Sequence, residues 1–223
     1  MTGALLAIEQ SGREASVAVR FEADAQGRDL HMRFFSGQRG VTLLSEIDDL
    51  LKEAGVNKNQ LSAVLVGIGP GSYTGLRIAC AAARTLSFAL EIPCAGVVGF
   101  QAKMLEAPLD QTAHFVLDAY RKEIYHASYR RTRDAIETLS APLILPQEQC
   151  DSAVPLGEAF FGDPGLFTDE RASLGAQTNP NAAQILDYAA FCGVTLDAPR
   201  LEVFENATPL YLRAAAFRSS PKA

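Results

Sequence analysis

The sequence predicts an α/β protein in which helices pack on mixed β-sheets and the chain forms two lobes. Three strand-like segments precede the first helix-like segment, and helices and strands then alternate up to residue 100. The later segments are shorter and less regular. We therefore expect an N-terminal lobe over residues 1–100 and a smaller, more irregular C-terminal lobe over residues 101–223, whose tail docks back on the protein.

The chain opens with strands and then changes to a helical pattern. An apolar run over residues 4–8, a polar turn and an alternating run over 15–19 predict a β-hairpin, and residues 30–36 are the expected third strand. Thr42 is the expected N-cap of the first helix and Gly55 its expected end. The apolar residues of this helix follow the 3.6-residue period: Leu43, Leu44, Ile47, Leu50, Leu51 and Ala54.

Strands and a second helix alternate in the rest of the first lobe. Residues 63–68 form a continuous apolar run of strand length, and a glycine-rich loop connects them to a helix over residues 74–90. Pro93 ends that helix, because proline cannot continue one. Residues 94–98 are the next expected strand.

The second half gives weaker signals. Two strands are expected over residues 113–117 and 123–130, whereas residues 138–180 read mostly as loop. Asn179 and Pro180 predict a helix N-terminus with proline at the first helical position, and Gly193 predicts its end. The apolar tail segment 209–213 is expected to dock.

Composition limits the kind of function. The chain has 223 residues, 48% of them hydrophobic and 21% charged, which is typical of a soluble globular protein. Its formal net charge is −6 at a sequence pI of about 5.1, whereas a protein that grips nucleic acid alone usually has a basic patch. The densest basic cluster, residues 129–133, is expected to be the solvated end of a strand. If this protein works on RNA, another subunit must supply most of the basic surface.

The four cysteines indicate a reducing compartment. Cys80, Cys94, Cys150 and Cys192 form no C-x-x-C pair and no disulfide framework. The first residues lack the features of a signal peptide, and no apolar run is long enough to span a bilayer. We therefore expect a cytoplasmic protein with no membrane association.

The glycine loop over residues 69–77 is the most informative segment. A strand-to-helix junction of this kind offers free backbone N–H groups to an anion. The weak candidates for holding a phosphate are Gly69, Gly71, Ser72, Thr74 and Asp118. The loop has neither the lysine of a Walker motif nor the third glycine of a Rossmann motif. The alternative is a tight turn with no ligand, so no cofactor-binding residue is assigned.

Catalytic and metal-binding patterns are lacking. The three histidines fit no metal motif, and no G-x-S-x-G element is present. His114 lies in an apolar strand and is expected to be a satisfied core residue. For Asp118 we favour a cap or turn role over contact with a metal-bound phosphate. For Glu9 we favour a surface turn over the orientation of a nucleotide-bound metal. We expect no catalytic and no metal-ligating residues.

The helix over residues 74–90 is apolar around most of its circumference. A helix that covers one face of a sheet needs only one apolar stripe. Plain burial between the sheet and the first helix is one explanation, and contact of both helices with a second subunit is the other. The expected partner surface consists of Leu43, Ile47, Leu50, Ala54, Arg77, Ile78, Ala82 and Leu86.

Residues 68–78, I-G-P-G-S-Y-T-G-L-R-I, resemble the hallmark G-P-G-S-[FY]-T-G-L-R-[IV] of the TsaB (YeaZ) family. Further matches are E-A-G at 53–55, I-P at 92–93, the L-D-A and E-I-Y parts of 117–125, and P-x-Y-L-R at 209–213. The resemblance covers nearly the whole chain. It departs from the family where Glu9 replaces an aspartate and where Tyr120 replaces an arginine.

The resemblance implies an actin/Hsp70/sugar-kinase-like (ribonuclease H-like) fold. It also implies a noncatalytic activator of TsaD, the subunit that transfers threonylcarbamoyl to adenosine beside the tRNA anticodon. Such proteins pair with TsaD as a heterodimer, are joined by the TsaE ATPase, and form homodimers by the same surface when alone. Under this hypothesis the chain needs no cofactor, ATP acts in the complex, and tRNA is met only through the complex.

Two other hypotheses stay open at this point. The first is a nucleotide-binding ATPase or phosphotransferase of the actin-like superfamily that uses the glycine loop and Asp118. The altered Glu9 and Tyr120 turns make independent ATP hydrolysis less favoured. The second is a dinucleotide-binding oxidoreductase, which the missing third glycine and the three leading strands disfavour.

Overall fold

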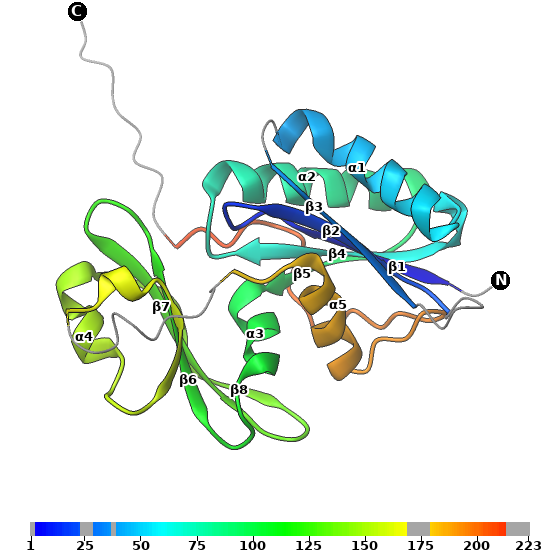
Figure 1. Ribbon diagram of the computed structural model, residues 1–223. Coiled ribbons are helices and arrows are strands. Elements are labelled where there is room, and N and C mark those ends of the chain that lie inside the picture. Colours follow the sequence, from blue (N-terminus) through cyan, green and yellow to red (C-terminus); the bar gives the residue numbers. More distant parts are fainter. Residues whose placement is uncertain (1–2, 23–28, 37–38, 169–178, 213–223) are drawn as a thin grey trace, which may run out of the picture.

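The computed structural model describes residues 3–22, 29–36, 39–168 and 179–212 (Figure 1). Its first sheet has five strands in the order β3-β2-β1-β4-β5. Strands β1 and β2 are antiparallel, as are β2 and β3, whereas β1, β4 and β5 run parallel. The strands are β1 (Ala4–Glu9), β2 (Ala15–Arg20), β3 (Leu30–Phe35), β4 (Leu61–Gly69) and β5 (Cys94–Val98).

Helices cover both faces of this sheet (Figure 1). Helices α1 (Arg39–Ala54) and α2 (Tyr73–Leu90) lie on one face, and α3 (Gly99–Lys103) and α5 (Ala182–Phe191) on the other. Each face has its own apolar cluster. This double cover explains why β1 and β4 read as continuous apolar runs rather than as alternating ones.

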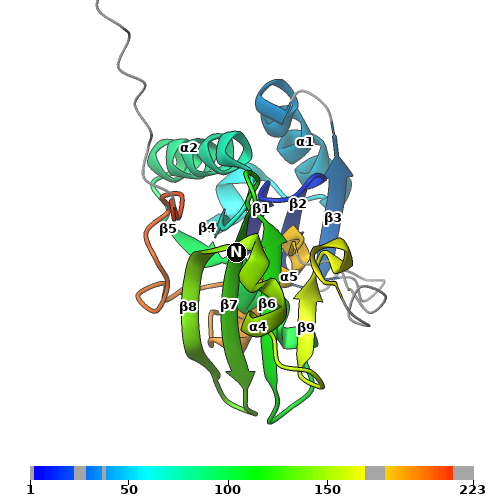
Figure 2. The ribbon, with the colours of Figure 1, turned by 90° about the vertical axis from the view of Figure 1, so that its left-hand side faces the viewer.

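The second sheet has four strands in the order β8-β7-β6-β9 (Figure 2). One face packs on α3, which therefore contacts both lobes, and the other face packs on α4. The strands are β6 (Thr112–Asp118), β7 (Glu123–Arg131), β8 (Ile136–Pro146) and β9 (Ala159–Gly162). The short helices are α4 (Cys150–Ala153) and the 3-10 turns Lys58–Gln60, Met104–Glu106, Gln147–Gln149 and Pro164–Leu166.

The chain returns to the first sheet after β9. Helix α5 packs on β1 and β2. After α5, Glu205 forms an antiparallel bridge with Gly96 of β5, and the Leu210 N–H donates to the Ile68 carbonyl at 2.9 Å. The described end of the tail therefore lies against β4 and β5. A division at residue 100 separates the two sheets. Helix α5, which covers the first sheet, nevertheless lies after residue 100.

Three expectations on the elements were wrong. Helix α1 begins at Arg39, so Thr42 lies inside it and its carbonyl accepts from the Ser45 hydroxyl. The cap of α5 is Asn181, whose side chain forms a capping box with Gln184. Segment 138–180 holds most of β8, which contains Pro142 and ends at Pro146; an edge strand tolerates such prolines.

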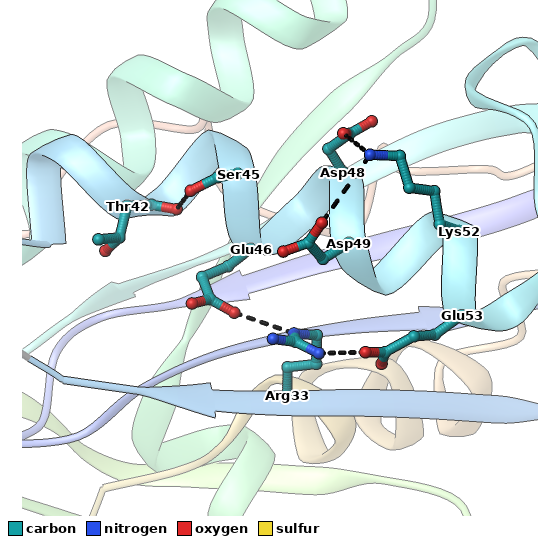
Figure 3. A network of polar contacts seen from close by, with 8 residues as sticks. All are labelled: Arg33, Thr42, Ser45, Glu46, Asp48, Asp49, Lys52 and Glu53. Atoms are coloured by element: carbon teal, nitrogen blue, oxygen red, sulfur yellow. Dashed lines mark hydrogen bonds and ion pairs between the residues drawn. The ribbon is translucent and has the colours of Figure 1, made fainter.

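A polar network fixes α1 to the edge strand β3 (Figure 3). The Arg33 guanidinium pairs with Glu46 at 2.9 Å and also contacts Glu53, about two helical turns further along α1. Lys52 pairs with Asp48 and Asp49 on the outer side of the same helix. Among the described helices, none is long and apolar enough to cross a membrane.

Candidate functional site

The glycine loop lies where the parallel strands β1, β4 and β5 end. In open α/β sheets ligands bind at this carboxyl edge. The structure brings the β1–β2 turn, the loop between β4 and α2, and Asn179 together here. Of the five phosphate candidates, Gly69, Gly71 and Ser72 form this junction, and Thr74 is exposed in the first turn of α2.

Most backbone N–H groups at the start of α2 already donate hydrogen bonds to other atoms of the chain. The Ser72 N–H donates to the Ser11 carbonyl at 2.8 Å, and the Gly75 N–H donates to the Ser72 hydroxyl at 3.2 Å. A Cβ added to Gly71 would lie 2.5 Å from the Ser11 carbonyl oxygen. The β1–β2 turn therefore fills the space in which a phosphate would meet these N–H groups, and the geometry fits the tight-turn alternative.

Glu9 is not a surface residue, so that expectation was wrong. Its side chain is 1% exposed, and Oε1 accepts from the Ser11 N–H at 2.5 Å. A Cβ added to Gly67 would lie 1.6 Å from the other carboxylate oxygen, so only glycine fits beside it. A buried carboxylate repels a bare phosphate. Within the described ranges no group of three or more His, Cys, Asp or Glu residues could hold a metal ion.

Cys80 lies near Glu9 and is an inert core thiol. Burial first, and then the negative field of Glu9, raise its pKa to about 12. The thiolate is the reactive form of cysteine. Cys80 therefore stays protonated at neutral pH and offers no nucleophile at this junction.

Asp118 belongs to the second sheet and has the turn role that the sequence favoured. It is exposed at the end of β6, and its Oδ1 accepts from the Tyr120 N–H at 2.7 Å. Tyr120, Arg121 and Lys122 all have positive φ, between 58° and 63°. The carboxylate therefore stabilises a left-handed turn between β6 and β7.

Replacing Ser72 with alanine tests whether the hydroxyl serves the helix. The variant loses the acceptor for the Gly75 N–H, so we expect the free energy of unfolding to fall by about 1 kcal/mol in a denaturant titration. Ser45→Ala, in the exposed middle of α1, is the matched control and should change it by less than about 0.5 kcal/mol. An equal effect of both substitutions would contradict the capping role.

The residues expected to bind a partner divide into core and surface. Leu43, Ile47 and Leu50 are buried against the first sheet, so their side chains contact the chain's own core. Four others are half-buried and pack on the same core: Ala54, Ile78, Ala82 and Leu86. Arg77 is exposed. The helices themselves stay the predicted interface, but most of the side chains first proposed face inward.

The outer face of α2 carries a stripe of exposed residues, of which Arg77 alone belongs to the partner surface expected from the sequence. Its exposed residues recur at helical spacing: Arg77, Ala81, Arg84, Thr85 and Phe88. Phe88 is 88% exposed, the highest value among the large hydrophobic side chains described. On α1, Leu44 is 60% exposed. A helical wheel that starts from the buried Leu76, Ala79 and Ala83 would have placed this stripe on the opposite side.

The two outer helix faces have opposite charge. Among the α1 side chains that the structure describes, Asp48, Asp49 and Glu53 are exposed acids and Lys52 is an exposed base (Figure 3). On α2 the exposed charges are Arg77 and Arg84. An acidic face and a basic face therefore lie on the two neighbouring helices.

The tail adds an aromatic group at the start of α2. The Tyr73 and Tyr211 rings lie 5.1 Å apart, and Arg77 donates to the Tyr73 hydroxyl at 2.9 Å. Partial burial raises the pKa of Tyr211 above its ordinary value. The motif over residues 209–213 thus holds the helix start through Tyr211, while Arg213 lies outside the described residues.

A separate pocket of about 360 Å³ lies in the second lobe. Its lining residues include Lys122, Glu148, Asp151 and Thr168, and the Thr168 hydroxyl donates to Asp151. None of the side chains that line it was predicted as a site residue. One basic side chain, Lys122, and two acidic ones, Glu148 and Asp151, line the pocket, so its charge favours neither an anionic nor a cationic ligand.

A family model described as "TsaD: tRNA N6-adenosine threonylcarbamoyltransferase" matches residues 37–157. The chain is 27% identical to the "tRNA threonylcarbamoyladenosine biosynthesis protein TsaB" of Escherichia coli K12, over 94% of each chain. A protein of the same description from Haemophilus influenzae is also 27% identical, over 94% of this chain and 93% of its own.

Solved structures agree with these relatives. "YeaZ from Pseudomonas aeruginosa" has a TM-score of 0.70 at 28% identity and covers 94% of this chain and 100% of its own. An uncharacterized Pseudomonas aeruginosa protein "with similarity to peptidase YEAZ" has a TM-score of 0.73 at 27% identity, with 95% and 100% covered. The predicted actin/Hsp70/sugar-kinase-like fold with two mixed sheets and flanking helices is confirmed.

Proposed function

The chain belongs to the TsaB (YeaZ) family, within the family described as tRNA N6-adenosine threonylcarbamoyltransferase, and on that premise we propose that it is a noncatalytic partner subunit of a TsaD enzyme. In this role it activates TsaD in the formation of N6-threonylcarbamoyladenosine next to the tRNA anticodon. The chain takes part in the reaction by positioning the catalytic subunit.

One observation supports the proposal: the outer faces of α1 and α2 combine exposed apolar side chains with charges of opposite sign. Phe88 on α2 is 88% exposed and Leu44 on α1 is 60% exposed, so each helix presents a large apolar side chain to solvent. Ala81 lies one turn from Arg77 and lets another helix approach closely, and the arginines of α2 complement the acids of α1. These features favour a helical bundle formed by two helices from each of two subunits.

The β1–β2 turn occupies the space beside the glycine loop, and we call this arrangement the self-filled junction. It supports the noncatalytic part of the proposal. Because Ser11 occupies the space beside Gly71 and Glu9 is buried beneath it, a phosphate would have to displace the chain's own turn. We therefore propose that ATP acts on a TsaE-like ATPase and on TsaD rather than on this chain. In this proposal the protein is cytoplasmic, meets tRNA only through the complex, and forms a homodimer by the same helices when alone.

Titration of the purified chain with a TsaD subunit in a calorimeter, followed by size-exclusion chromatography, tests the partnership. We expect a 1:1 heterodimer, and we expect the homodimer to disappear as the heterodimer forms because both use one surface. No binding, or binding that leaves a homodimer intact within a larger assembly, would contradict the proposal.

A second candidate function is nucleotide binding at the glycine junction. The observation that favours it is that the buried Ser11 Oγ and Asn179 Oδ1 have no hydrogen-bond partner among the described residues. Both atoms lie at the carboxyl edge of the parallel strands, where a ligand is expected. Calorimetric titration of the isolated chain with ATP and Mg²⁺ separates the two: measurable binding together with hydrolysis would favour the enzyme.

A further inference from the structure

Helix α3 and the segment after it contribute side chains to the cores of both sheets. Phe100, Met104 and Ala107 pack on the second sheet, whereas Ala102 and Leu105 pack on the α5 side of the first sheet. Helix α3 also contacts α5 directly, and it lies between the two sheets (Figure 1). The connection between the lobes is therefore a packed helix and not a free linker.

Strand β7 holds the end of this connection through Arg131. The Arg131 guanidinium Nη1 donates to the Leu105 carbonyl at 2.5 Å and to the Ala107 carbonyl at 2.7 Å. The backbone adds a further bond, from the Asp110 N–H to the Arg131 carbonyl at 2.7 Å. The 3-10 turn Met104–Glu106 is thus fixed to the second sheet.

A buried ammonium group orients the Glu106 carboxylate at the end of this turn. Lys103 is 7% exposed, and its Nζ donates to Glu106 Oε1 at 2.8 Å and lies 2.7 Å from Oε2. The same ammonium lies 5.8 Å from the centre of the Phe161 ring on β9. A buried charge is costly unless it is paired, so Lys103 keeps the Glu106 carboxylate in this place.

The Glu106 carboxylate also reaches the first turn of α5. Gln184 Oε1 accepts from the Asn181 N–H at 2.8 Å in the capping box, and Gln184 Nε2 donates to Glu106 Oε1. Helix α5 belongs to the first sheet, because it packs on β1 and β2 and its Ala182 N–H donates to Ser16 Oγ at 2.9 Å. This hydrogen bond therefore connects a turn fixed to the second sheet with a helix fixed to the first.

We propose that Glu106 and Gln184 form a latch that fixes the angle between the two sheets. Two-lobed proteins that close on a ligand bend at a few residues between their lobes. Here those residues are packed on both cores, and the latch holds them at the surface, where the Glu106 side chain is 44% exposed. The chain then moves as one rigid body. This inference does not rest on the proposed function.

Replacing Gln184 with glutamate separates the latch from the helix cap. Glutamate serves in a capping box as glutamine does, and a helix N-terminus favours a negative charge. If Gln184 served only its own helix, the substitution would leave the structure unchanged or stabilise it. The latch predicts the opposite, because two carboxylates would then face each other between the sheets.

Residual dipolar couplings of the full chain test the proposal directly. In wild type, the backbone N–H couplings of the two sheets should fit one alignment tensor. In Gln184→Glu the two sets of couplings should need two tensors of different magnitude. Two tensors in wild type, or one common tensor in Gln184→Glu, would overturn the latch.

Hydrogen exchange gives the size of the effect. The amides of residues 104–107 and 182–186 should exchange about 10-fold faster in Gln184→Glu, the factor expected when a hydrogen bond to a charged group is lost. Gln60→Glu is the matched control, because Gln60 has the same position in a capping box with Asn57. It should exchange like wild type. Equal rates in the two variants would contradict the latch.

A double variant shows whether the two side chains act on each other. Glu106→Gln combined with Gln184→Glu exchanges the carboxylate and the amide, so that a donor again faces an acceptor. The couplings of this variant should return to one tensor, and its exchange should be slower than in Gln184→Glu alone. Two tensors in the double variant would contradict the pairing of Glu106 with Gln184.

Discussion

Replacing Phe88 with aspartate is expected to weaken binding to a TsaD subunit by about 100-fold, and to weaken the homodimer in the same way. The side chain is 88% exposed, so the monomer loses little when it is changed. At a helical interface a central aromatic residue typically contributes 2 kcal/mol or more, and a buried unpaired carboxylate adds a further cost. A loss of about 2.7 kcal/mol corresponds to this factor.

Calorimetric affinity and the melting temperature, measured on the same preparation, check this prediction. Val203→Asp is the matched control, because Val203 is 71% exposed and its neighbours Leu201 and Phe204 pack on the α5 side of the first sheet. It should bind like wild type. Wild-type affinity in Phe88→Asp, or equal losses in both variants, would show that the outer face of α2 is not the interface.

Ala82 and Leu86 belong to the partner surface expected from the sequence, so a charge at either position is another substitution for the same test. Both side chains are half-buried and pack on the core of the first sheet. A charge there is expected to lower the stability of the monomer as well as any pairing. Phe88 separates the two effects, because its substitution leaves that core intact.

Replacing Gly71 with alanine is expected to lower the free energy of unfolding by about 3 kcal/mol, at the upper end of typical overpacking costs. The added Cβ would lie 2.5 Å from the Ser11 carbonyl oxygen and 2.7 Å from Ser11 Cβ. These are backbone-anchored atoms that cannot rotate away. The glycine loop would have to separate from the β1–β2 turn, and the Ser72 N–H would lose its acceptor.

Denaturant titrations of Gly71→Ala and of Gly55→Ala measure this effect against a control. Gly55 has φ of 67° and nothing within 4 Å of its added Cβ, so its substitution costs only the left-handed backbone, about 1 kcal/mol. If both variants lose the same amount, the close approach at Gly71 is not what requires glycine, and the case for a self-filled junction fails.

The first lobe could be predicted closely from sequence because local pattern and tertiary structure agree there. The strand over 94–98 was placed to the residue, since Pro93 separates it from α2. The second sheet was harder. Strand β8 contains prolines that ordinarily count against a strand, and only its edge position makes them acceptable.

The partner helices were identified from the sequence, but most of their contact residues were not. The apolar period on α1 identifies Leu43, Ile47 and Leu50, which form the side of the helix that packs on the core. It does not identify the residues on the outer side. Helix α2 is apolar over most of its surface, so no single stripe shows which side faces out. The burial of Glu9 also depends on contacts far along the chain, with Gly67 and the loop after it.

The contacts of His114 could not be predicted from local sequence for a similar reason. The sequence predicted His114 as a satisfied core residue, and burial confirms it. Its partners are fixed by strand register and by a residue 44 positions away. Neither contact can be predicted from a short segment of sequence.

Reconstitution of tRNA threonylcarbamoylation from purified components tests the central claim most directly. With TsaD, TsaE, ATP and threonylcarbamoyl donor present, we expect modification only when this chain is added, full activity with Val203→Asp, and little with Phe88→Asp. The chain supplied without TsaD should transfer nothing. Transfer by this chain alone, or unchanged modification in its absence, would contradict the account and favour an enzyme in its own right.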